Sequence, residues 1–400
     1  MGPNQKQSET MMQSLSRQFR VVLAILVWWV ATAAHAQLTA VVAVEPTSRA
    51  ESHAISRSAI ETGLAQVTGQ VVAVSTSDDL ASVMRATRSG GFSIFIGPAQ
   101  VAASALTRGY ELVGSTGSSS QYVLVARKGV DTLAAMKGRR LYLPQQDSIY
   151  TYMARGMLNQ AGLSFKDLRA VQYHKYPEAG LPALLLGGSD ATVVGASAWA
   201  QWSQQNKGVA QLLATSQPVP DGFSVVMSPD IPKEQRAAIA KWFVSTAANT
   251  GLGAMSPRSD TREYVRVAEL GLFTPVSLPN VKVVGADEVQ KLQSSGAVLV
   301  DTRTEKEFKT KHIRGAVHAA YVEKSLKDVA FDAASDDFSA LDTVQGLGKD
   351  TPVVFACNGA ECWKSYKAAK TAQGKGFTQV YWFRGGLPEW VAKGLATAGV

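Results

Sequence analysis

The sequence predicts an α/β protein with two α/β lobes followed by a smaller α/β domain that has a central parallel sheet. Two observations lead to this fold class. Short apolar runs rich in β-branched residues alternate with longer amphipathic stretches along most of the chain, as expected for a parallel sheet covered by helices. The composition is globular, with 46% hydrophobic and 18% charged residues, and the length of 400 residues predicts two or three domains.

The first 36 residues have the pattern of a cleavable secretory signal peptide. Two arginines precede an apolar run at 21–30, and Ala34-His35-Ala36 offers the small residues that a signal peptidase recognises. The apolar run is shorter than the roughly 20 residues that span a bilayer. We therefore expect cleavage near Ala36 and Gln37, a periplasmic mature chain and no stable membrane span. An uncleaved N-terminal anchor is the alternative.

Residues 37–274 are expected to form the two lobes, as one domain. Its strands are expected at residues 38–44, 71–75, 92–96, 121–126, 141–143, 191–194 and 221–227. Its helices are expected at residues 50–67, 78–89, 148–161, 181–186 and 233–249. We expect the strand at 221–227 to return to the first sheet, so that the chain crosses between the lobes twice.

Residues 275–280 contain two prolines and are expected to link this domain to a third α/β unit at 281–400. The strands of this unit are expected at residues 298–300, 353–355 and 379–382, and its helices at 286–294, 363–373 and 388–394. The stretch 323–350 is polar and weakly patterned, so it is interpreted as an insertion or a long loop.

The charge of the chain argues against a nucleic-acid partner. Lysine and arginine number 40 against 32 acidic residues, a formal net charge of +8, and the basic residues form no long run. Nucleic-acid binding requires a basic stripe or a recognisable reading motif, and the sequence has neither. The small surplus of positive charge suits anionic small ligands at most.

The two cysteines, Cys357 and Cys362, lie in one short loop between an expected strand and a helix that begins near Trp363. Backbone N–H groups and the helix dipole at such a position stabilise a thiolate, so Cys357 is a candidate nucleophile. Lys364 adds a nearby positive charge. The expected catalytic loop consists of Asn358, Gly359, Ala360, Glu361, Cys362 and Lys364 together with the nucleophile.

Residues 281–400 resemble the rhodanese family through four pieces in the family's order. These pieces are Asp301-Thr302-Arg303 with Glu307-Phe308, the segment His312–His318, Cys357 at a strand end, and Gly385-Gly386 with Trp390. The resemblance implies a sulfurtransferase that forms a persulfide at Cys357 from thiosulfate or a related donor and passes the sulfur to a thiol or another nucleophile. We expect no cofactor and no metal. Asp301 and Arg303 are expected to orient the loop, or to pair with each other and with Glu307.

The loop departs from the common form of the family. The interval from Cys357 to Ser365 is two residues longer, and the loop contains no arginine, which leaves the substrate preference open. Cys362 is either a resolving thiol that attacks a persulfide on Cys357 or half of a structural disulfide that blocks transfer. A metal held by both thiolates would lack further ligands. Cys357 as an inert buried cysteine is the remaining alternative.

Residues 38–270 resemble type 2 periplasmic solute-binding proteins, closest to the phosphonate- and phosphite-binding branch. The resemblance rests on Glu45-Pro46-Thr47-Ser48, Ser75 with Asp79, the segments Phe92–Ala99 and Met136–Arg140, Ser148, and the segment Gly187–Ala191. It implies a ligand between the lobes, where helix N-termini favour an oxyanion. The expected ligand-binding residues are Thr47, Ser48, Gln100, Ser148, Tyr150 and Thr151. Each hydroxyl is alternatively a helix cap.

The leading hypothesis is an exported sulfurtransferase with an attached module that binds an anion or another small molecule. A small-molecule sulfur donor and a thiol acceptor are its expected partners, and a transporter or sensor is expected for the binding module. Two alternatives remain. The chain is a solute-binding receptor whose rhodanese-like module is catalytically reduced, or it is a thiol redox protein that uses Cys357 and Cys362.

Overall fold

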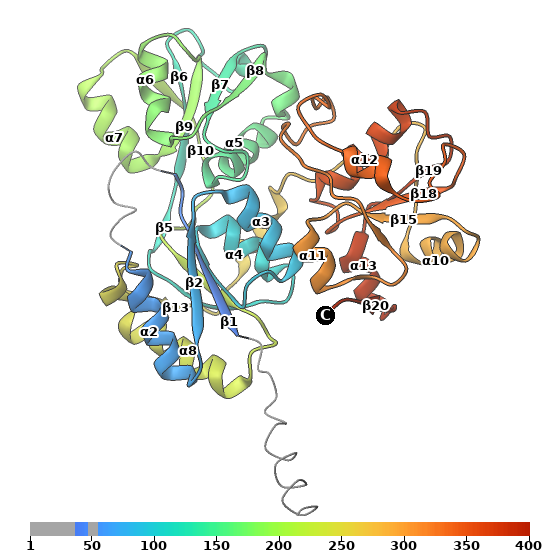
Figure 1. Cartoon of the computed structure of the whole chain (residues 1–400). Helices are drawn as coiled ribbons and strands as arrows, with labels where there is room; N and C mark the ends of the chain where they lie inside the picture. Colours follow the sequence, from blue (N-terminus) through green and yellow to red (C-terminus); the bar gives the residue numbers. More distant parts are fainter. Residues whose placement is uncertain (1–36, 47–54) are drawn as a thin grey trace, which may run out of the picture. The chain divides into compact units, whose positions relative to one another are not determined.

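The computed structural model describes residues 37–46 and 55–400 (Figure 1). The expected signal peptide at 1–36 and two of the expected ligand-binding residues, Thr47 and Ser48, lie outside the described residues. In the part of the chain that the structure describes, no helix combines the length and the apolar character needed to cross a membrane.

The first lobe is built on a mixed sheet in the order β13-β4-β12-β3-β1-β2. Its strands are β1 (Leu38–Ala43), β2 (Val72–Ser77), β3 (Ile94–Gly97), β4 (Glu111–Ser115), β12 (Ser224–Met227) and β13 (Ser256–Pro257). Its helices are α2 (Arg57–Thr68), α3 (Leu80–Ser89), α4 (Ala99–Leu106), α8 (Lys233–Thr246) and α9 (Arg262–Glu269). Strand β1 pairs in parallel with β3, whereas β12 runs antiparallel to both β3 and β4.

The second lobe has a sheet in the order β10-β6-β9-β7-β8. Its strands are β6 (Tyr122–Arg127), β7 (Arg140–Leu143), β8 (Ala170–Tyr173), β9 (Ala191–Gly195) and β10 (Ala210–Thr215), and its helices are α5 (Ile149–Gln160), α6 (Gly180–Leu185) and α7 (Ala196–Gln205). The chain leaves the first sheet after β4 and returns to it at β12, so the predicted double crossing is confirmed. At the crossings, β5 (Ser119–Ser120) pairs with β11 (Val219–Pro220).

Buried strands and capped helices explain why the first two sheets form at these residues. Val41 and Phe95 lie on the paired strands β1 and β3 and are almost completely buried, as expected for strands covered on both faces. Helix α3 begins at an N-cap, Asp79, whose carboxylate accepts from Ser82 N, and α5 begins at Ser148, whose hydroxyl accepts from Thr151 N.

The C-terminal domain contains a fully parallel sheet in the order β14-β19-β18-β15-β17, drawn in orange and red in Figure 1. Its strands are β14 (Lys282–Val283), β15 (Val298–Asp301), β17 (Val317–His318), β18 (Val353–Ala356) and β19 (Val380–Phe383). Its helices are α10 (Ala286–Ser294), α11 (Glu305–Thr310), α12 (Trp363–Gly374) and α13 (Gly386–Ala392), and β16 (His312–Ile313) pairs with β20 (Thr397–Ala398).

The two faces of this sheet are covered by separate apolar clusters. Val353 and Phe355 of β18 pack in one cluster with Trp382, whereas Val354 and Ala356 pack in the other. Successive side chains of a strand point to opposite faces, so burial on both faces requires a continuous apolar run. This requirement explains why the run at 353–356 marks the middle strand of the sheet.

The stretch 323–350 has little regular structure, in agreement with its weak pattern, and it contains the short 3-10 helix Ser339–Thr343. One lysine of α12 anchors it. The side chain of Lys367 is fully buried, and its Nζ lies 2.8 Å from Glu323 Oε1 and donates to Ser325 Oγ at 2.8 Å. Asp336, also buried, lies 3.8 Å from the same ammonium.

Candidate functional site

The cysteine loop lies between the middle strand of the parallel sheet and a helix N-terminus. Cys357 directly follows β18, and Cys362 is the N-cap residue of α12. The two cysteines form a disulfide with a Cα–Cα distance of 6.1 Å, and their exposed fractions are only 2% and 3%. Any reaction of Cys357 as a nucleophile therefore requires that this disulfide first be reduced.

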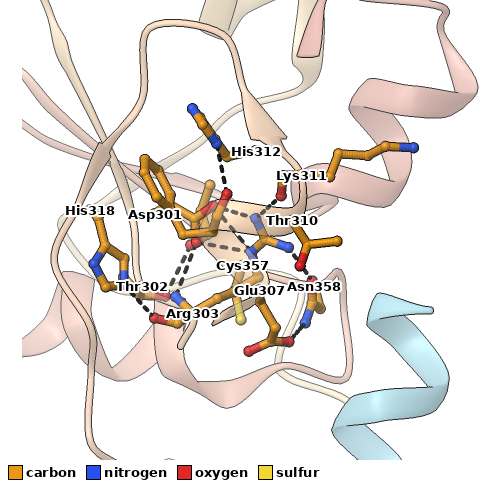
Figure 2. Close-up of polar contacts among 12 residues, drawn as sticks. Asp301, Thr302, Arg303, Glu307, Thr310, Lys311, His312, His318, Cys357 and Asn358 are labelled. Carbon is orange, nitrogen blue, oxygen red and sulfur yellow. Dashed lines mark hydrogen bonds and ion pairs between the residues drawn. The ribbon is translucent and has the colours of Figure 1, made fainter. Parts of the chain in front are cut away.

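A buried polar cluster lies beside the loop, and Figure 2 shows its members. Arg303 Nε donates to Asp301 Oδ1 at 2.9 Å and Arg303 Nη2 donates to Asp301 Oδ2 at 2.6 Å. Arg303 Nη1 donates to Asn358 Oδ1 at 3.3 Å. Asn358 Nδ2 in turn donates to Glu307 Oε1 at 2.6 Å. The cluster thus connects the end of β15 to the residue that follows Cys357.

The other polar groups of this cluster have structural contacts. Burial alone would raise the pKa of Glu307, but hydrogen bonds from Thr304 and Asn358 outweigh it and lower the pKa. His312 and His318 each have a ring nitrogen at hydrogen-bond distance from a backbone carbonyl oxygen, at 2.7 Å and 3.0 Å, and both stack on Phe308. These contacts fix the rings beside the loop.

Several charged side chains approach the loop. Lys364, in the first turn of α12, is buried, and this burial together with nearby Arg85 lowers its pKa. The carboxylate of Glu361 lies 3.7 Å from the guanidinium of Arg88 in α3, and both side chains are largely buried. Positive charge from Lys364 and from the α12 N-terminus would favour a thiolate at Cys357 once the disulfide is reduced, whereas the charges of Arg88 and Glu361 offset each other.

The segment just before the expected linker holds the loop from outside. Thr274 donates to the Ala360 carbonyl oxygen from both its backbone nitrogen, at 2.8 Å, and its hydroxyl, at 2.6 Å. Trp363 Nε1 donates to Leu272 O at 2.9 Å. Arg384 donates to the Thr274 and Pro275 carbonyl oxygens, both at 2.9 Å. Residues 272–275 therefore form part of the structural support of the cysteine loop.

Gly386 allows the chain after β19 to pass directly against Cys357. Its φ is +56°, and a Cβ atom on it would lie 2.1 Å from the Cys357 carbonyl oxygen. That oxygen accepts a hydrogen bond from Leu387 N at 2.9 Å. The glycine is thus required both by its backbone conformation and by the close approach of the loop.

Gly386→Ala is expected to displace Cys357 and to slow the reaction of its reduced thiol with an alkylating reagent. Gly394→Ala is the matched control, because Gly394 has a φ of +67° but no atom within 4 Å of its added Cβ. The control should lose only the roughly 1–2 kcal/mol of a left-handed alanine. Urea unfolding and the mass of the reduced, alkylated protein are the measurements. Normal adduct formation in Gly386→Ala would contradict the expectation.

The N-terminal domain contains a cavity of about 620 Å³ lined by residues of both lobes, among them Pro46, Tyr150, Leu181 and Trp202. Of the expected ligand-binding residues, Tyr150 is the one that lines it among the described residues. Gln100, Ser148 and Thr151 are fully buried.

These three buried side chains bind protein atoms instead of facing the cavity. Ser148 caps α5, and the Thr151 hydroxyl donates to Gln145 O at 2.9 Å. Gln100 Nε2 donates to Glu45 Oε1 at 2.8 Å and to Asp147 O at 3.1 Å. The alternative interpretation as a helix cap thus agrees with the geometry of Ser148, whereas the Thr151 hydroxyl holds the loop that precedes α5.

Glu45 lines the cavity and was not among the expected ligand-binding residues. Its Oε1 also accepts from Ile149 N, the first residue of α5, at 2.7 Å. Its Oε2 is buried and has no hydrogen-bond partner in the described structure. Two signals in the sequence pointed to it: its position directly after a buried strand, where ligands of such folds bind, and its place in the Glu45–Ser48 piece of the resemblance.

Within residues 37–46 and 55–400, no group of three or more histidine, cysteine, aspartate or glutamate side chains is placed to hold a metal ion.

Two lobes with a cavity between their sheets, followed by a parallel sheet with a cysteine at the end of its middle strand, define a solute-binding domain joined to a rhodanese-like domain. Residues 42–278 match the family described as ABC transporter, phosphonate, periplasmic substrate-binding protein, and residues 285–393 match the rhodanese-like domain. The chain belongs to this family of periplasmic substrate-binding proteins and carries a C-terminal rhodanese-like domain. Both resemblances inferred from the sequence are confirmed.

Among curated proteins, the C-terminal domain is similar to thiosulfate sulfurtransferase GlpE. The protein of Ectopseudomonas mendocina (strain ymp) is 30% identical over 111 residues, which cover 28% of this chain and 85% of the relative. The protein of Pseudomonas syringae pv. syringae (strain B728a) is 30% identical over 109 residues, which cover 27% of this chain and 86% of the relative.

Among solved structures, the N-terminal domain is similar to binding proteins. PhnD1 from Prochlorococcus marinus (MIT 9301), in complex with methylphosphonate, is 12% identical with a TM-score of 0.46, covering 59% of this chain and 97% of PhnD1. XAC2383 from Xanthomonas citri, bound to ATP, is 14% identical with a TM-score of 0.46, covering 58% of this chain and 95% of XAC2383.

Proposed function

We propose that this chain is an exported rhodanese-type sulfurtransferase whose N-terminal domain binds a small molecule. The observation that carries the proposal is the position of Cys357, between the end of the middle strand β18 and the N-terminus of α12. Backbone N–H groups at a helix N-terminus favour both a thiolate and an anionic sulfur donor. The similarity of this domain to thiosulfate sulfurtransferases supports the same assignment.

The proposed reaction balances without a cofactor. The Cys357 thiolate attacks the outer sulfur of thiosulfate, a new S–S bond forms, and sulfite leaves with the electron pair of the broken S–S bond. A thiolate acceptor then attacks the outer sulfur of the resulting persulfide. The acceptor becomes a persulfide, and Cys357 is released as a thiolate.

The disulfide requires a role for Cys362 in this scheme. A dithiol reductant opens the disulfide by thiol–disulfide exchange. The S–S bond of the protein is broken and an S–S bond forms within the reductant, which leaves two thiols on the protein. In the absence of an acceptor, the Cys362 thiolate attacks the Cys357 sulfur of the persulfide. This step re-forms the disulfide and expels hydrosulfide, so Cys362 acts as a resolving thiol.

Export and ligand binding complete the proposal. The signal pattern at residues 1–36 would direct the chain to the periplasm, with cleavage near Ala36 and Gln37. Membership of a periplasmic substrate-binding family supports this location and a small-molecule ligand in the N-terminal domain. A membrane transporter or a sensor is the proposed partner of the ligand-bound domain.

The disulfide also favours a second candidate function. A thiol redox protein would use Cys357 and Cys362 as a dithiol pair, and the two cysteines are bonded to each other in this structure. The absence of an arginine from the loop sequence similarly favours a binding receptor whose rhodanese-like domain has lost turnover.

The test is the intact mass of the reduced mature protein after brief exposure to thiosulfate. We expect wild type and Cys362→Ser to gain one sulfur, about 32 Da, and Cys357→Ser to gain none. Cys362→Ser should retain the adduct longer than wild type, because it has no resolving thiol. Each variant replaces one cysteine sulfur with a serine oxygen, so each is the control of the other.

If no form acquires the sulfur and the disulfide returns rapidly in air, sulfur transfer is wrong and the redox function is favoured. If no form acquires the sulfur and the thiols stay reduced, the receptor function is favoured. An adduct on Cys357→Ser would place the reactive sulfur at Cys362 and would also overturn the assignment of the nucleophile.

A further inference from the structure

We propose that the cleft of the N-terminal domain binds a ligand with a protonated amine, which donates to the free oxygen of Glu45. The inference rests on the proposed small-molecule binding by this domain, and it is independent of sulfur transfer at Cys357. The proposed ligand is cationic, whereas the sequence led us to expect an oxyanion.

The N-terminus of α5 lies at the cleft, since Tyr150 in its first turn lines the cavity, and it is the kind of position at which an anionic ligand binds. Here the position is taken by the protein itself, because Glu45 Oε1 accepts from Ile149 N at 2.7 Å. Gln100 Nε2, from α4, donates to the same oxygen at 2.8 Å. An incoming oxyanion would have to displace this carboxylate or lie beside its negative charge.

The other carboxylate oxygen of Glu45 is not used in capping α5. This oxygen, Oε2, is buried without a hydrogen-bond partner among the described residues. A buried acceptor without a donor costs about 1–3 kcal/mol, and more when it is charged. Glu45 lines the cavity, so a donor supplied by a ligand would remove this cost.

The described part of the cavity wall is acidic and apolar. Among the described residues that line the cavity, two, Glu45 and Glu178, are carboxylates, and none is lysine, arginine or histidine. Tyr150, Leu181 and Trp202 supply apolar and aromatic surface. A positive charge next to carboxylates and aromatic rings is favourable, whereas an anion would have no counter-charge on these residues. A volume of about 620 Å³ suits an amine with an apolar body.

The protonation of Glu45 provides an additional test. Burial raises the pKa of Glu45 to about 7, opposed by the hydrogen bonds from Ile149 and Gln100 and increased by the negative charge of Asp147. Burial tends to raise the pKa of Asp147 too, but the Lys327 ammonium holds it below its ordinary value. Tyr122 and Tyr150 also interact with Glu45, and burial raises the pKa of both, so they stay neutral near pH 7.

A protonated Glu45 cannot attract a cation as strongly as the carboxylate does. Aliphatic amines keep their proton between pH 6 and pH 8, because their pKa is near that of lysine, about 10.4. The affinity for an amine is therefore expected to rise about tenfold from pH 6 to pH 8, as the ionised fraction of Glu45 rises.

The experiment is calorimetric titration of the mature protein in buffers free of amines, sulfonates and phosphate. The cationic probes are phenethylamine, putrescine and spermidine, and the anionic probes are methylphosphonate, methanesulfonate and thiosulfate. Glu45→Gln keeps an oxygen that can accept from Ile149 and Gln100 but places an NH₂ donor at the Oε2 position. Glu234→Gln, which changes an exposed carboxylate of α8, is the control of equal charge change.

We expect at least one amine to bind, with an affinity that rises with pH in wild type. Glu45→Gln should weaken this binding tenfold or more and abolish the pH dependence, whereas Glu234→Gln should change neither. Binding of an oxyanion without any amine would overturn the inference and leave the binding role of the domain intact. Binding of no probe would overturn both. Sulfur transfer at Cys357 is judged separately by the mass of its adduct.

Discussion

Replacing Arg303 with methionine is expected to lower the free energy of unfolding of the rhodanese-like domain by about 3–5 kcal/mol. The guanidinium and Asp301 are both buried, with exposed fractions of 2% and 4%. Without the guanidinium, the Asp301 carboxylate keeps a hydrogen bond from the backbone nitrogen of residue 303, at 3.0 Å, but loses its counter-charge. The Lys311 carbonyl oxygen also loses a donor at 2.6 Å.

Urea unfolding followed by tryptophan fluorescence measures this effect. Lys309→Met is the control, since Lys309 pairs with Glu305 on the surface of the same domain, and such pairs contribute about 0.5 kcal/mol or less. The double change Asp301→Asn with Arg303→Met should recover part of the loss, because it removes the buried charge. A double variant no more stable than Arg303→Met would mean that the unpaired carboxylate is not the cause.

Lys367→Met is expected to release the polar stretch 323–350 from α12 and to cost a similar free energy, about 3–5 kcal/mol. The substitution removes the ammonium that lies 2.8 Å from Glu323 and 3.8 Å from Asp336. It also removes the donor to the backbone and side chain of Ser325. Asp336 retains hydrogen bonds from Ser325 and Tyr321, so part of the segment should keep its local turn.

Hydrogen exchange of peptides from residues 321–337 measures this release directly. Lys370→Met is the matched control on the same helix, because Lys370 is exposed and donates to one backbone carbonyl oxygen, that of Val329. We expect faster exchange throughout the peptides in Lys367→Met and a change confined to the region of Val329 in Lys370→Met. Equal protection in Lys367→Met and wild type would show that the apolar contacts of the segment suffice to hold it.

The cysteine loop could be located from the sequence because its determinants are local. The apolar run before Cys357 predicts a strand buried on both faces, and the residues after Cys362 predict a helix, so the loop between them follows directly. The same local patterns placed most of the strands and helices of both lobes and the return of β12 to the first sheet. Helices α4, α7 and α9 and strands β4, β8 and β10 were missed, since tertiary contacts rather than a strong periodicity define them.

The state of the ligand cleft could not be predicted, because it depends on contacts between distant residues. Glu45 and Ile149 are 104 positions apart, and nothing in the sequence near either shows that the carboxylate caps the helix. Ser148 and Thr151 are residue types that are common in anion-binding sites. In the fold, the Ser148 hydroxyl accepts from Thr151 N and the Thr151 hydroxyl donates to Gln145 O. Residue type alone cannot distinguish a hydroxyl that binds a ligand from one that binds the protein backbone.

Buried ion pairs were predictable only where the two partners are close together in the sequence. Asp301 and Arg303 are separated by one residue at a strand end, and their pairing follows from that spacing. Lysine side chains are usually exposed, so the sequence gives no reason to expect Lys367 in the interior. Its charge is tolerated there because Glu323, 44 positions earlier in the chain, forms an ion pair with it.

The contacts of Leu272, Thr274 and Pro275 bear on where the rhodanese-like domain can be separated from the rest of the chain. A fragment that starts at residue 281 would remove the donors to Ala360 O and would leave the indole N–H of Trp363 and the guanidinium of Arg384 without their acceptors. Such a fragment would expose its cysteine loop on a newly created surface. A fragment that is to retain these contacts of the cysteine loop must therefore begin near residue 271, about fourteen residues before the homologous region at 285–393.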